Sequence, residues 1–268
     1  MITDADITAA SLWTLCGLGS CQFWRVSQRG EGWLLPNAAL AMSGEPHVEM
    51  NWAIVAAGED AEADLRACVR RLRARRLPGY VLLAGSVADS LAPIAEEIGL
   101  QGPDLTPLML LREPEHPTGE PSGLSIEVVH DSSGLADAVT VAAAAFDIDP
   151  ELLLRAWSRI LSPFSGVDVH VARDGSEPVS CVFSTRTLNA VGIWAMATVP
   201  GRQRQGAGRA LLSVLFSHHD TADVFYLFAS SAGEPLYGDL GFTVVDNAAY
   251  WAVPQPQSEH GWVDTRFV

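Results

Sequence analysis

The stretch AMATVPGRQRQGAGRALL, residues 195 to 212, decides the fold. An apolar run that predicts a strand, residues 191–199, stops at Pro200, and a polar loop of Arg and Gln follows it. Gly206-x-Gly208 then opens a segment whose apolar residues keep helical spacing. Glycine lets a backbone approach a ligand closely, and the free N–H groups of a helix's first turn bind anions. The pattern therefore predicts a pyrophosphate site, and a strand-turn-helix corner without a ligand is the alternative.

The lack of a third glycine in this motif excludes a dinucleotide-binding fold, and the lack of any lysine excludes sites that need one. A dinucleotide-binding fold requires a third glycine at position 211, which is Leu. All 17 basic residues are Arg, so the chain has no lysine for a Walker-type phosphate loop, for a Schiff base or for a lysine general base.

The elements around this stretch alternate regularly in the second half of the chain. Hydrophobic periodicity and turn signals predict the strands 124–129, 167–172, 179–185, 191–199, 224–229 and 242–245, and the helices 135–146, 150–161, 206 onward and 235–240. This order predicts an α/β fold in which a mixed central sheet carries helices on both faces.

The first half predicts a smaller unit of the same class. Its pattern is an apolar helix at the start, strands 48–55 and 80–83, helices 59–76 and 87–98, and an apolar run 108–111. Residues 112–123 hold three prolines, two glycines and three glutamates and are typical of a linker. We therefore expect two α/β domains, residues 1–117 and 118–268, of which only the second carries the Gly-x-Gly loop.

The charge balance narrows the possible partners. The chain of 268 residues has a net charge of -15, with 9 Arg against 15 acids up to residue 117 and 8 Arg against 17 acids after it. Neither half has the basic excess of a nucleic-acid binder, and a small cationic substrate suits an acidic protein better. Acidic residues at the N-terminus and the lack of a long apolar run predict a cytoplasmic protein with no signal peptide and no membrane span.

Two motifs together resemble the GNAT superfamily of acyl-CoA-dependent N-acyltransferases. Gln203-x-x-Gly206-x-Gly208 matches the family's phosphate motif, and Leu236-Tyr237-x-x-Leu240-Gly241-Phe242 matches its second signature, in the right order. The resemblance covers residues 124 to 252 and implies acetyl-CoA as cosubstrate, with no metal. It places the cofactor on Ala197, Thr198, Val199, Gln203, Arg204, Gln205, Gly206, Ala207, Gly208, Arg209 and Ser230. The chain departs from the family at Arg204, where glycine is usual, and at Gln203 and Gln205, where arginine is common.

Acyl transfer to an amine poses two proton problems. The resemblance implies Tyr237 as the catalytic residue that protonates the departing CoA thiolate, and a core aromatic beside Phe242 is the alternative. The thioester carbonyl is expected on a strand amide near Ala197 or Val199. Residues 191–197 hold no carboxylate for a base, so water or the segment 147–151, which carries Asp147, Asp149 and Glu151, has to serve.

Other candidate residues carry a stronger structural alternative. His218 and His219 end the expected helix, where an imidazolium suits the helix dipole, so a metal or catalytic role is the minor alternative. Trp157, Trp194 and Phe164 are expected to wall an acceptor pocket or to belong to the core. The four cysteines lack paired spacing and are expected to be free thiols.

The sequence thus predicts a GNAT-type acetyltransferase. It would move an acetyl group from acetyl-CoA to a primary amine of a small molecule by direct attack in a ternary complex. The alternative is a catalytically silent acyl-CoA-binding or scaffold protein. The first half resembles, more faintly, the amino-terminal partner domain of two-domain GNAT proteins, and we expect it to help shape the acceptor cleft.

Overall fold

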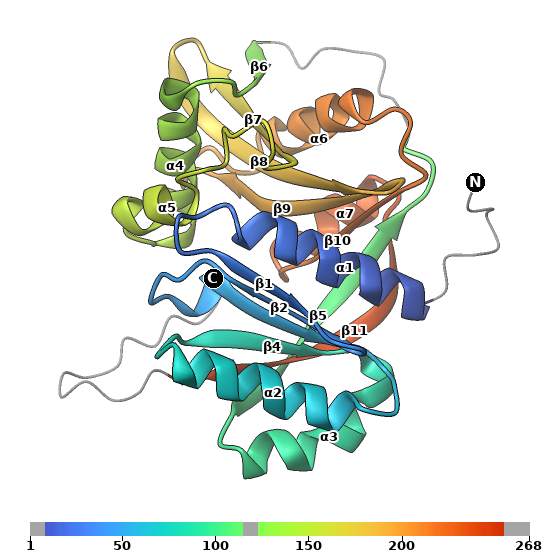
Figure 1. The fold of residues 1–268 in the computed structure, drawn as a ribbon. Coiled ribbons are helices and arrows are strands. Elements are labelled where there is room, and N and C mark those ends of the chain that lie inside the picture. The colour runs from blue at the N-terminus through green and yellow to red at the C-terminus, as the bar shows by residue number, and fades with distance from the viewer. Residues whose placement is uncertain (1–8, 115–122, 255–268) are drawn as a thin grey trace.

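Residues 9–114 and 123–254 are described by a computed structural model, and in these residues all strands join one mixed sheet. Its order is β1-β2-β3-β4-β11-β5-β10-β9-β8-β7-β6 (Figure 1). The strands are β1 Glu31–Leu34, β2 Ala38–Met42, β3 Asn51–Val55, β4 Gly79–Leu83, β5 Gln101–Leu111, β6 Leu124–Val128, β7 Val167–Asp174, β8 Glu177–Thr187, β9 Ala190–Thr198, β10 Val224–Phe228 and β11 Thr243–Val253. The α-helices are α1 Ala9–Trp24, α2 Ala61–Ala74, α3 Gly85–Glu97, α4 Ser132–Phe146, α5 Pro150–Ala156, α6 Ala207–His218 and α7 Glu234–Asp239, and Val48–Met50 form a 3₁₀ turn.

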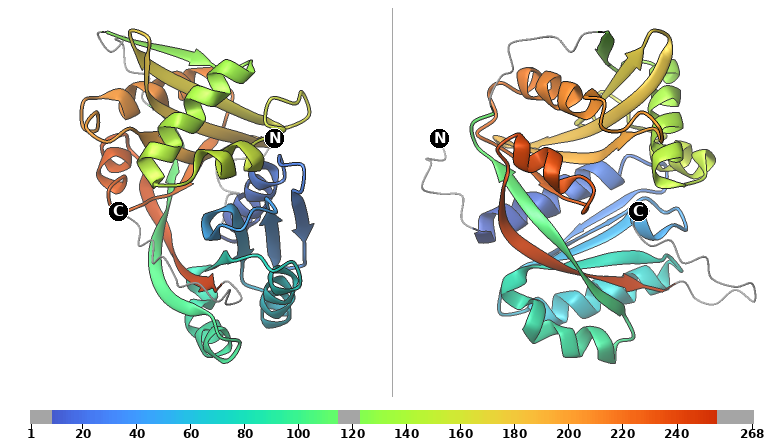
Figure 2. Two further views of the ribbon diagram at one scale, coloured as in Figure 1. Left: turned by 90° about the vertical axis from the view of Figure 1, so that its left-hand side faces the viewer. Right: turned by 180° about the vertical axis from the view of Figure 1, so that it is seen from behind.

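Helices cover both faces of the sheet, as the sequence predicts. One core cluster packs α1, α4 and α5 against strands of both halves. A second packs α2 and α3 under the first half, and a third packs α6 and α7 against the second half (Figure 2). The predicted α/β class with a mixed central sheet is therefore confirmed.

Two long strands cross between the halves of the chain. β5, from the first half, pairs with β10, and β11, from the second half, pairs with β4 as well as with β5. The expected boundary at residue 117 therefore does not divide the sheet, and most of the expected linker, residues 115–122, lies outside the described residues. A chain that began near Ser122 would lack β5, which sits between β10 and β11.

Several element bounds differ from the sequence prediction for physical reasons. The hairpin of β1 and β2 was not predicted, because β1 is mostly exposed and β2 is buried along its whole length, so neither alternates. The predicted strand 48–55 begins with a 3₁₀ turn. The predicted helix 150–161 ends at Ala156, and the predicted strand 242–245 continues to Val253, because β4 and β5 pair with it on both sides.

An aromatic cluster joins the two halves of the sheet. Phe23 of α1 stacks on Trp194 of β9 at 5.6 Å between ring centroids and lies 5.8 Å from Phe183 of β8. Trp157 is 1% exposed and Trp194 is 6% exposed, whereas Phe164 is 89% exposed. The interpretation of Trp157, Trp194 and Phe164 as walls of one acceptor pocket is therefore wrong: the two tryptophans fill the core, and Phe164 lies at the surface.

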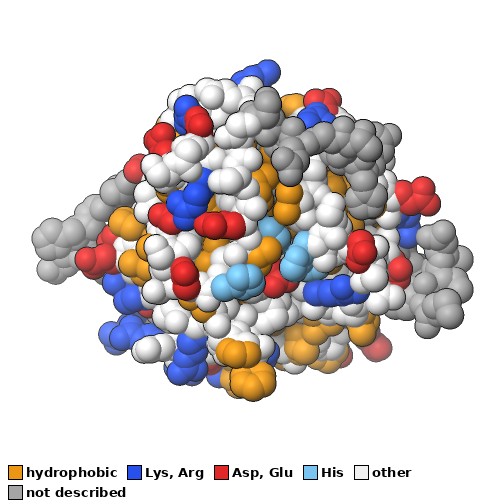
Figure 3. Space-filling view, turned by 90° about the horizontal axis from the view of Figure 1, so that it is seen from above, with side chains coloured by type: hydrophobic (Ala, Val, Ile, Leu, Met, Phe, Trp, Pro, Cys, Tyr) orange, Lys and Arg blue, Asp and Glu red, His pale blue; other side chains and the backbone are white. Residues whose placement is uncertain are grey.

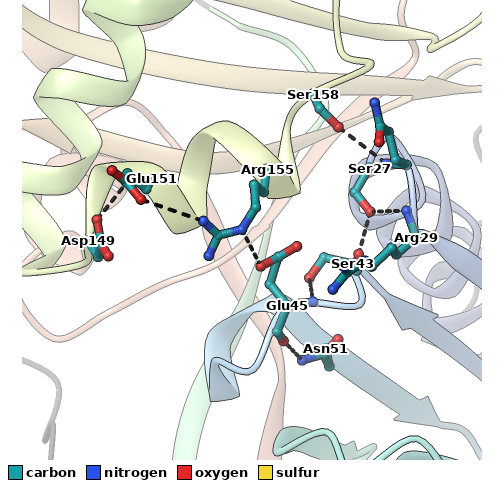
Figure 4. Close-up of polar contacts among 10 residues, drawn as sticks. Ser27, Arg29, Ser43, Glu45, Asn51, Asp149, Glu151, Arg155 and Ser158 are labelled. Atoms are coloured by element: carbon teal, nitrogen blue, oxygen red, sulfur yellow. Dashed lines mark hydrogen bonds and ion pairs between the residues drawn. The ribbon is translucent and has the colours of Figure 1, made fainter.

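A polar joint lies beside this cluster (Figure 4). The buried carboxylate of Glu45, which follows β2, accepts a hydrogen bond from Arg155 Nε of α5 at 2.8 Å. Nearby, the backbone N–H of Arg159 donates to the carbonyl of Val26 at 2.7 Å. These contacts hold α5 against the first half of the chain.

None of the helices in the described ranges is long and apolar enough to span a membrane.

Candidate functional site

The two parallel strands of the second half, β9 and β10, separate toward their carboxyl ends. They pair only from Ala190 to Gly192 of β9, although β9 continues to Thr198. The register between β9 and β8 shifts between Trp194 and Ala197, where Ala195 takes a positive φ of 44°. A bulge of this kind bends a strand and leaves its extra residues outside the ladder. Ligands of open α/β sheets bind outside the carboxyl ends of such strands.

The amino end of α6 lies at this same edge, because α6 follows β9 directly. The connecting loop turns at three residues in the left-handed region, Gly201 (φ 82°), Arg204 (φ 62°) and Gly206 (φ 89°). Gly206 caps α6 without a side-chain hydrogen bond, and a Cβ built on Gly201 or Gly206 would meet no atom within 4 Å. The space beside the start of α6 is therefore open at these two glycines, and the first N–H groups of a helix have no partner within the helix, as an anion site requires.

The charged side chains of the loop are partly engaged within the protein. Arg202 forms an ion pair with Asp174 at the end of β7, and Arg209 lies 3.5 Å from Asp239 of α7. Arg204 and Gln203 are exposed, and Gln205 donates to the carbonyl of Gly201 at 3.0 Å. Hydrogen bonds to a bound phosphate would therefore come mainly from the backbone of the loop. The three arginines would attract the phosphate less than three unpaired cations, because Arg202 and Arg209 face carboxylates.

The residues expected along the pantetheine arm lie at the end of β9. Ser180 of β8 donates to the carbonyl of Ala197 at 2.5 Å and lies 2.8 Å from the hydroxyl of Thr198. The N–H of Val199 donates to the carbonyl of Val179 at 3.0 Å. The Val199 amide is therefore not free for a thioester carbonyl. The unpaired backbone of β9 lies at the bulge and, after Gly192, along the edge that no longer pairs with β10.

Ser230 and Tyr237 come together at the end of β10. Ser230 accepts a hydrogen bond from the N–H of Gly233 at 3.2 Å, in the turn that precedes α7. A Cβ on Gly233 would lie 2.9 Å from the Tyr237 ring and 3.4 Å from Ser230 Oγ. Tyr237 also lies 5.7 Å from Phe242, and burial raises the pKa of its phenol, which is protonated at neutral pH. The proton-donor and core roles of Tyr237 are both compatible with this position.

Two of the three carboxylates expected from the segment 147–151 are engaged elsewhere. Asp149 accepts from the N–H of Glu151 at the start of α5, and Glu151, whose side chain is 81% exposed, lies 3.9 Å from Arg155. Both belong to the polar joint in Figure 4 rather than to the edge of β9 and β10.

Glu49 is a carboxylate that the sequence did not single out. It lies in the 3₁₀ turn before β3, and burial raises its pKa from 4.5 to about 7. Its carbonyl accepts from Trp52 Nε1 at 2.7 Å, and the Trp52 ring lies 6.1 Å from Phe228 at the end of β10 and 6.2 Å from Trp194 of β9. The one signal in the sequence for a buried carboxylate here is that Glu49 is an acidic residue within the apolar run 48–55.

Comparison with known proteins identifies solved structures that share this fold. No family model matches the sequence, and no curated protein matches it. The structure is similar to a GCN5-related N-acetyltransferase from Kribbella flavida, with a TM-score of 0.65 and 17% identity over 92% of this chain and 95% of that chain. It is also similar to such a protein from Sphaerobacter thermophilus (TM-score 0.58, 14% identity, 81% and 76% covered). A tandem GNAT protein from the clavulanic acid biosynthesis pathway matches with a TM-score of 0.53 and 13% identity over 83% and 80% of the two chains. At these identities the likeness establishes a shared fold.

Proposed function

We propose that this chain, which has the fold of the GCN5-related N-acetyltransferases, transfers an acetyl group from acetyl-CoA to a primary amine of a small molecule. The observation that carries the proposal is the separation of β9 from β10 with the open amino end of α6 at the same edge. The gap between two parallel strands can take an extended pantetheine arm, and the helix end can take a pyrophosphate. The amine then attacks the thioester directly in a ternary complex.

The cofactor arrangement follows from these contacts. The pyrophosphate lies on the loop and first turn of α6, residues 203–209, with Arg204 as an exposed cation of the loop. The pantetheine arm runs between the ends of β9 and β10, past Ala197, Thr198 and Val199 on one side and Ser230 on the other. The bulge at Ala195 leaves backbone donors for the thioester carbonyl.

One residue serves each of the two proton transfers, the deprotonation of the amine and the protonation of the CoA thiolate. An alkyl ammonium of pKa near 10.4 loses its proton at a cost of about 4.6 kcal/mol at pH 7. Glu49, whose pKa is about 7, suits a base at that pH, and a chain of water molecules carries the proton from the amine to its carboxylate. Tyr237, protonated by virtue of its burial, donates to the CoA thiolate.

A catalytically silent acyl-CoA-binding or scaffold protein is the second candidate. The absence of a carboxylate from β9 and the two engaged arginines of the loop favour it. A CoA-release assay over a panel of primary amines, run beside calorimetry with acetyl-CoA, distinguishes the two. Release that depends on an amine supports the enzyme, and tight binding without release on any amine supports the silent binder.

A side chain at Gly206 should disable the phosphate site. Gly206 has a φ of 89°, and a valine there would strain the backbone and project into the space assigned to the pyrophosphate. We expect Gly206→Val to weaken acetyl-CoA binding at least tenfold, or about 1.4 kcal/mol, in calorimetry. Gly99→Val is the matched control, because Gly99 has a φ of 75° beyond α3 and should leave affinity unchanged. Equal affinity in folded Gly206→Val would rule out this placement of CoA.

Glu49 should leave two signatures of its pKa. As a base it acts when deprotonated, so kcat/KM should rise with pH through about 7, and Glu49→Gln should remove that inflection. The raised pKa means that the folded state binds the proton more tightly than the unfolded state. Stability should therefore fall by about 1 to 3 kcal/mol between pH 4.5 and 7, and Glu49→Gln should abolish the fall.

Denaturation and rate profiles across this pH range measure both effects. Glu96→Gln, at an exposed position of α3, is the control and should change neither. A stability loss that vanishes in Glu49→Gln while the rate inflection stays would leave Glu49 as a structural carboxyl and return the role of base to water.

A further inference from the structure

A cluster of histidines lies at the end of α6 that is remote from the loop. Asp168 and His170 are two residues apart on β7 and so share the face of the strand that packs against α6. His218 and His219 end that helix. The Nε2 atoms of His218 and His219 lie 3.8 and 3.6 Å from Asp168 Oδ2, and Asp168, His218 and His219 each present one ligand atom within 4.8 Å of the others.

The buried imidazole of His170 is the second observation. It is 0% exposed, and neither of its ring nitrogens has a hydrogen-bond partner among the described residues. Its ring centroid lies 5.2 Å from that of His218. Buried polar groups are almost always satisfied, and each unsatisfied group costs about 1 to 3 kcal/mol. An imidazole with both nitrogens unpaired beside three ligand atoms therefore points to a partner that the protein itself does not provide.

Contacts within the protein account for only part of this arrangement. The hydroxyl of Ser184 on β8 lies 3.0 Å from His219 Nε2 and can satisfy that nitrogen. Asp168 Oδ2 also lies 3.6 Å from His219 Nε2. Neither contact reaches His170.

We propose that Asp168, His218 and His219 bind one divalent transition-metal ion of the Zn²⁺ class. Ligand bonds of about 2.0 to 2.2 Å in a tetrahedral site separate neighbouring ligand atoms by roughly 3.3 to 3.6 Å, close to the separations observed. Two imidazoles and one carboxylate suit zinc better than the hard cations, which prefer oxygen ligands. Water takes the fourth position and gives one of the two His170 ring nitrogens a hydrogen-bond partner.

The site is open to solvent and separate from the acyl-transfer site. The side chain of Asp168 is 40% exposed and that of His218 is 39% exposed, and histidine side chains gather next to acidic ones on the face in Figure 3. α6 has 12 residues, so its two ends lie about 17 Å apart. The ion therefore clamps the carboxyl end of α6 to β7, where a positive charge also suits the helix dipole. This role does not depend on the proposed acyl transfer.

The test is calorimetry with Zn²⁺ on the full chain, prepared without a polyhistidine tag and freed of metal with a chelator. We expect one Zn²⁺ per chain, and we expect Asp168→Asn, at a half-buried position, and His218→Ala, at an exposed one, each to weaken binding at least tenfold. His130→Ala removes an exposed histidine between β6 and α4 and should leave affinity unchanged. Ser184→Ala should bind at least as tightly as the parent, because the Ser184 hydroxyl competes for His219.

Co²⁺ gives an independent readout. Its visible absorption bands should appear on titration into the parent chain and be absent from His218→Ala. Zn²⁺ should also raise the melting temperature of the parent and not that of His218→Ala. Absence of binding to the parent, or loss of affinity that is equal in His130→Ala and His218→Ala, would overturn the proposal.

Discussion

Tyr237→Phe is expected to lower kcat by roughly 100 to 10,000 fold with a good acceptor, while acetyl-CoA affinity stays within a few-fold. The substitution keeps the ring beside Phe242 and over Gly233 and removes only the hydroxyl. Burial raises the pKa of this phenol, so it is protonated at neutral pH and can donate as the tetrahedral intermediate collapses. The loss is smaller if solvent protonates the thiolate. Steady-state kinetics and calorimetry measure the two quantities separately.

Tyr226→Phe provides the matched control. Tyr226 is a buried phenol on β10 whose hydroxyl donates to the carbonyl of Leu15 at 3.0 Å. Its loss should cost about 1 kcal/mol of stability and leave kcat unchanged. If Tyr237→Phe turns over at the parent rate, Tyr237 is a core aromatic and water is the donor. If both variants lose turnover equally, the effect comes from packing rather than from a proton.

Phe23→Ala is expected to destabilise the whole chain by about 3 to 5 kcal/mol. Phe23 of α1 is 1% exposed, and its ring packs against Trp194 and Phe183 of the second half. Removing the ring leaves a cavity between packed aromatic side chains that have little freedom to close it. Because the same ring contacts both halves, the parent should unfold in one transition, and the variant should unfold in one transition at lower denaturant.

Phe164→Ala is the control for this substitution, since Phe164 is 89% exposed and should change stability by less than about 0.5 kcal/mol. Denaturation followed by far-UV circular dichroism and by tryptophan fluorescence measures both variants. A Phe23→Ala variant as stable as Phe164→Ala would show that α1 does not hold the halves together. Two separate transitions in the parent would show the halves to be independent.

Local sequence signals predicted most elements but not the way in which the halves combine. The strand at residues 191–199 and the helix after Gly206 follow from apolar periodicity, which short segments carry by themselves. The exchange of β5 and β11 depends on pairing between strands more than 130 residues apart, and no local pattern specifies such a partner. The prediction ended the strand at Val245 because the polar residues Asp246 and Asn247 interrupt the apolar run, and the buried stretch of β11 begins only at Ala248.

The candidate site divides in the same way. The glycines of the loop and Tyr237 belong to contiguous motifs, and the structure places them at one edge of the sheet. Glu49 and the group of Asp168, His218 and His219 depend on tertiary packing. Asp168 and His218 are 50 positions apart and meet only because α6 crosses β7. For the same reason the sequence could not show that the Val199 amide is engaged by Val179.

The central claim is that acetyl-CoA lies between the ends of β9 and β10 with its pyrophosphate on α6. The structure of the full chain crystallised with acetyl-CoA tests it most directly. We predict one molecule per chain, with the pyrophosphate in hydrogen-bond contact with amides in residues 204–209 and the thioester sulfur within reach of the Tyr237 hydroxyl. Acetyl-CoA bound away from this loop, or a pyrophosphate on the loop with the sulfur directed away from Tyr237, would contradict the account.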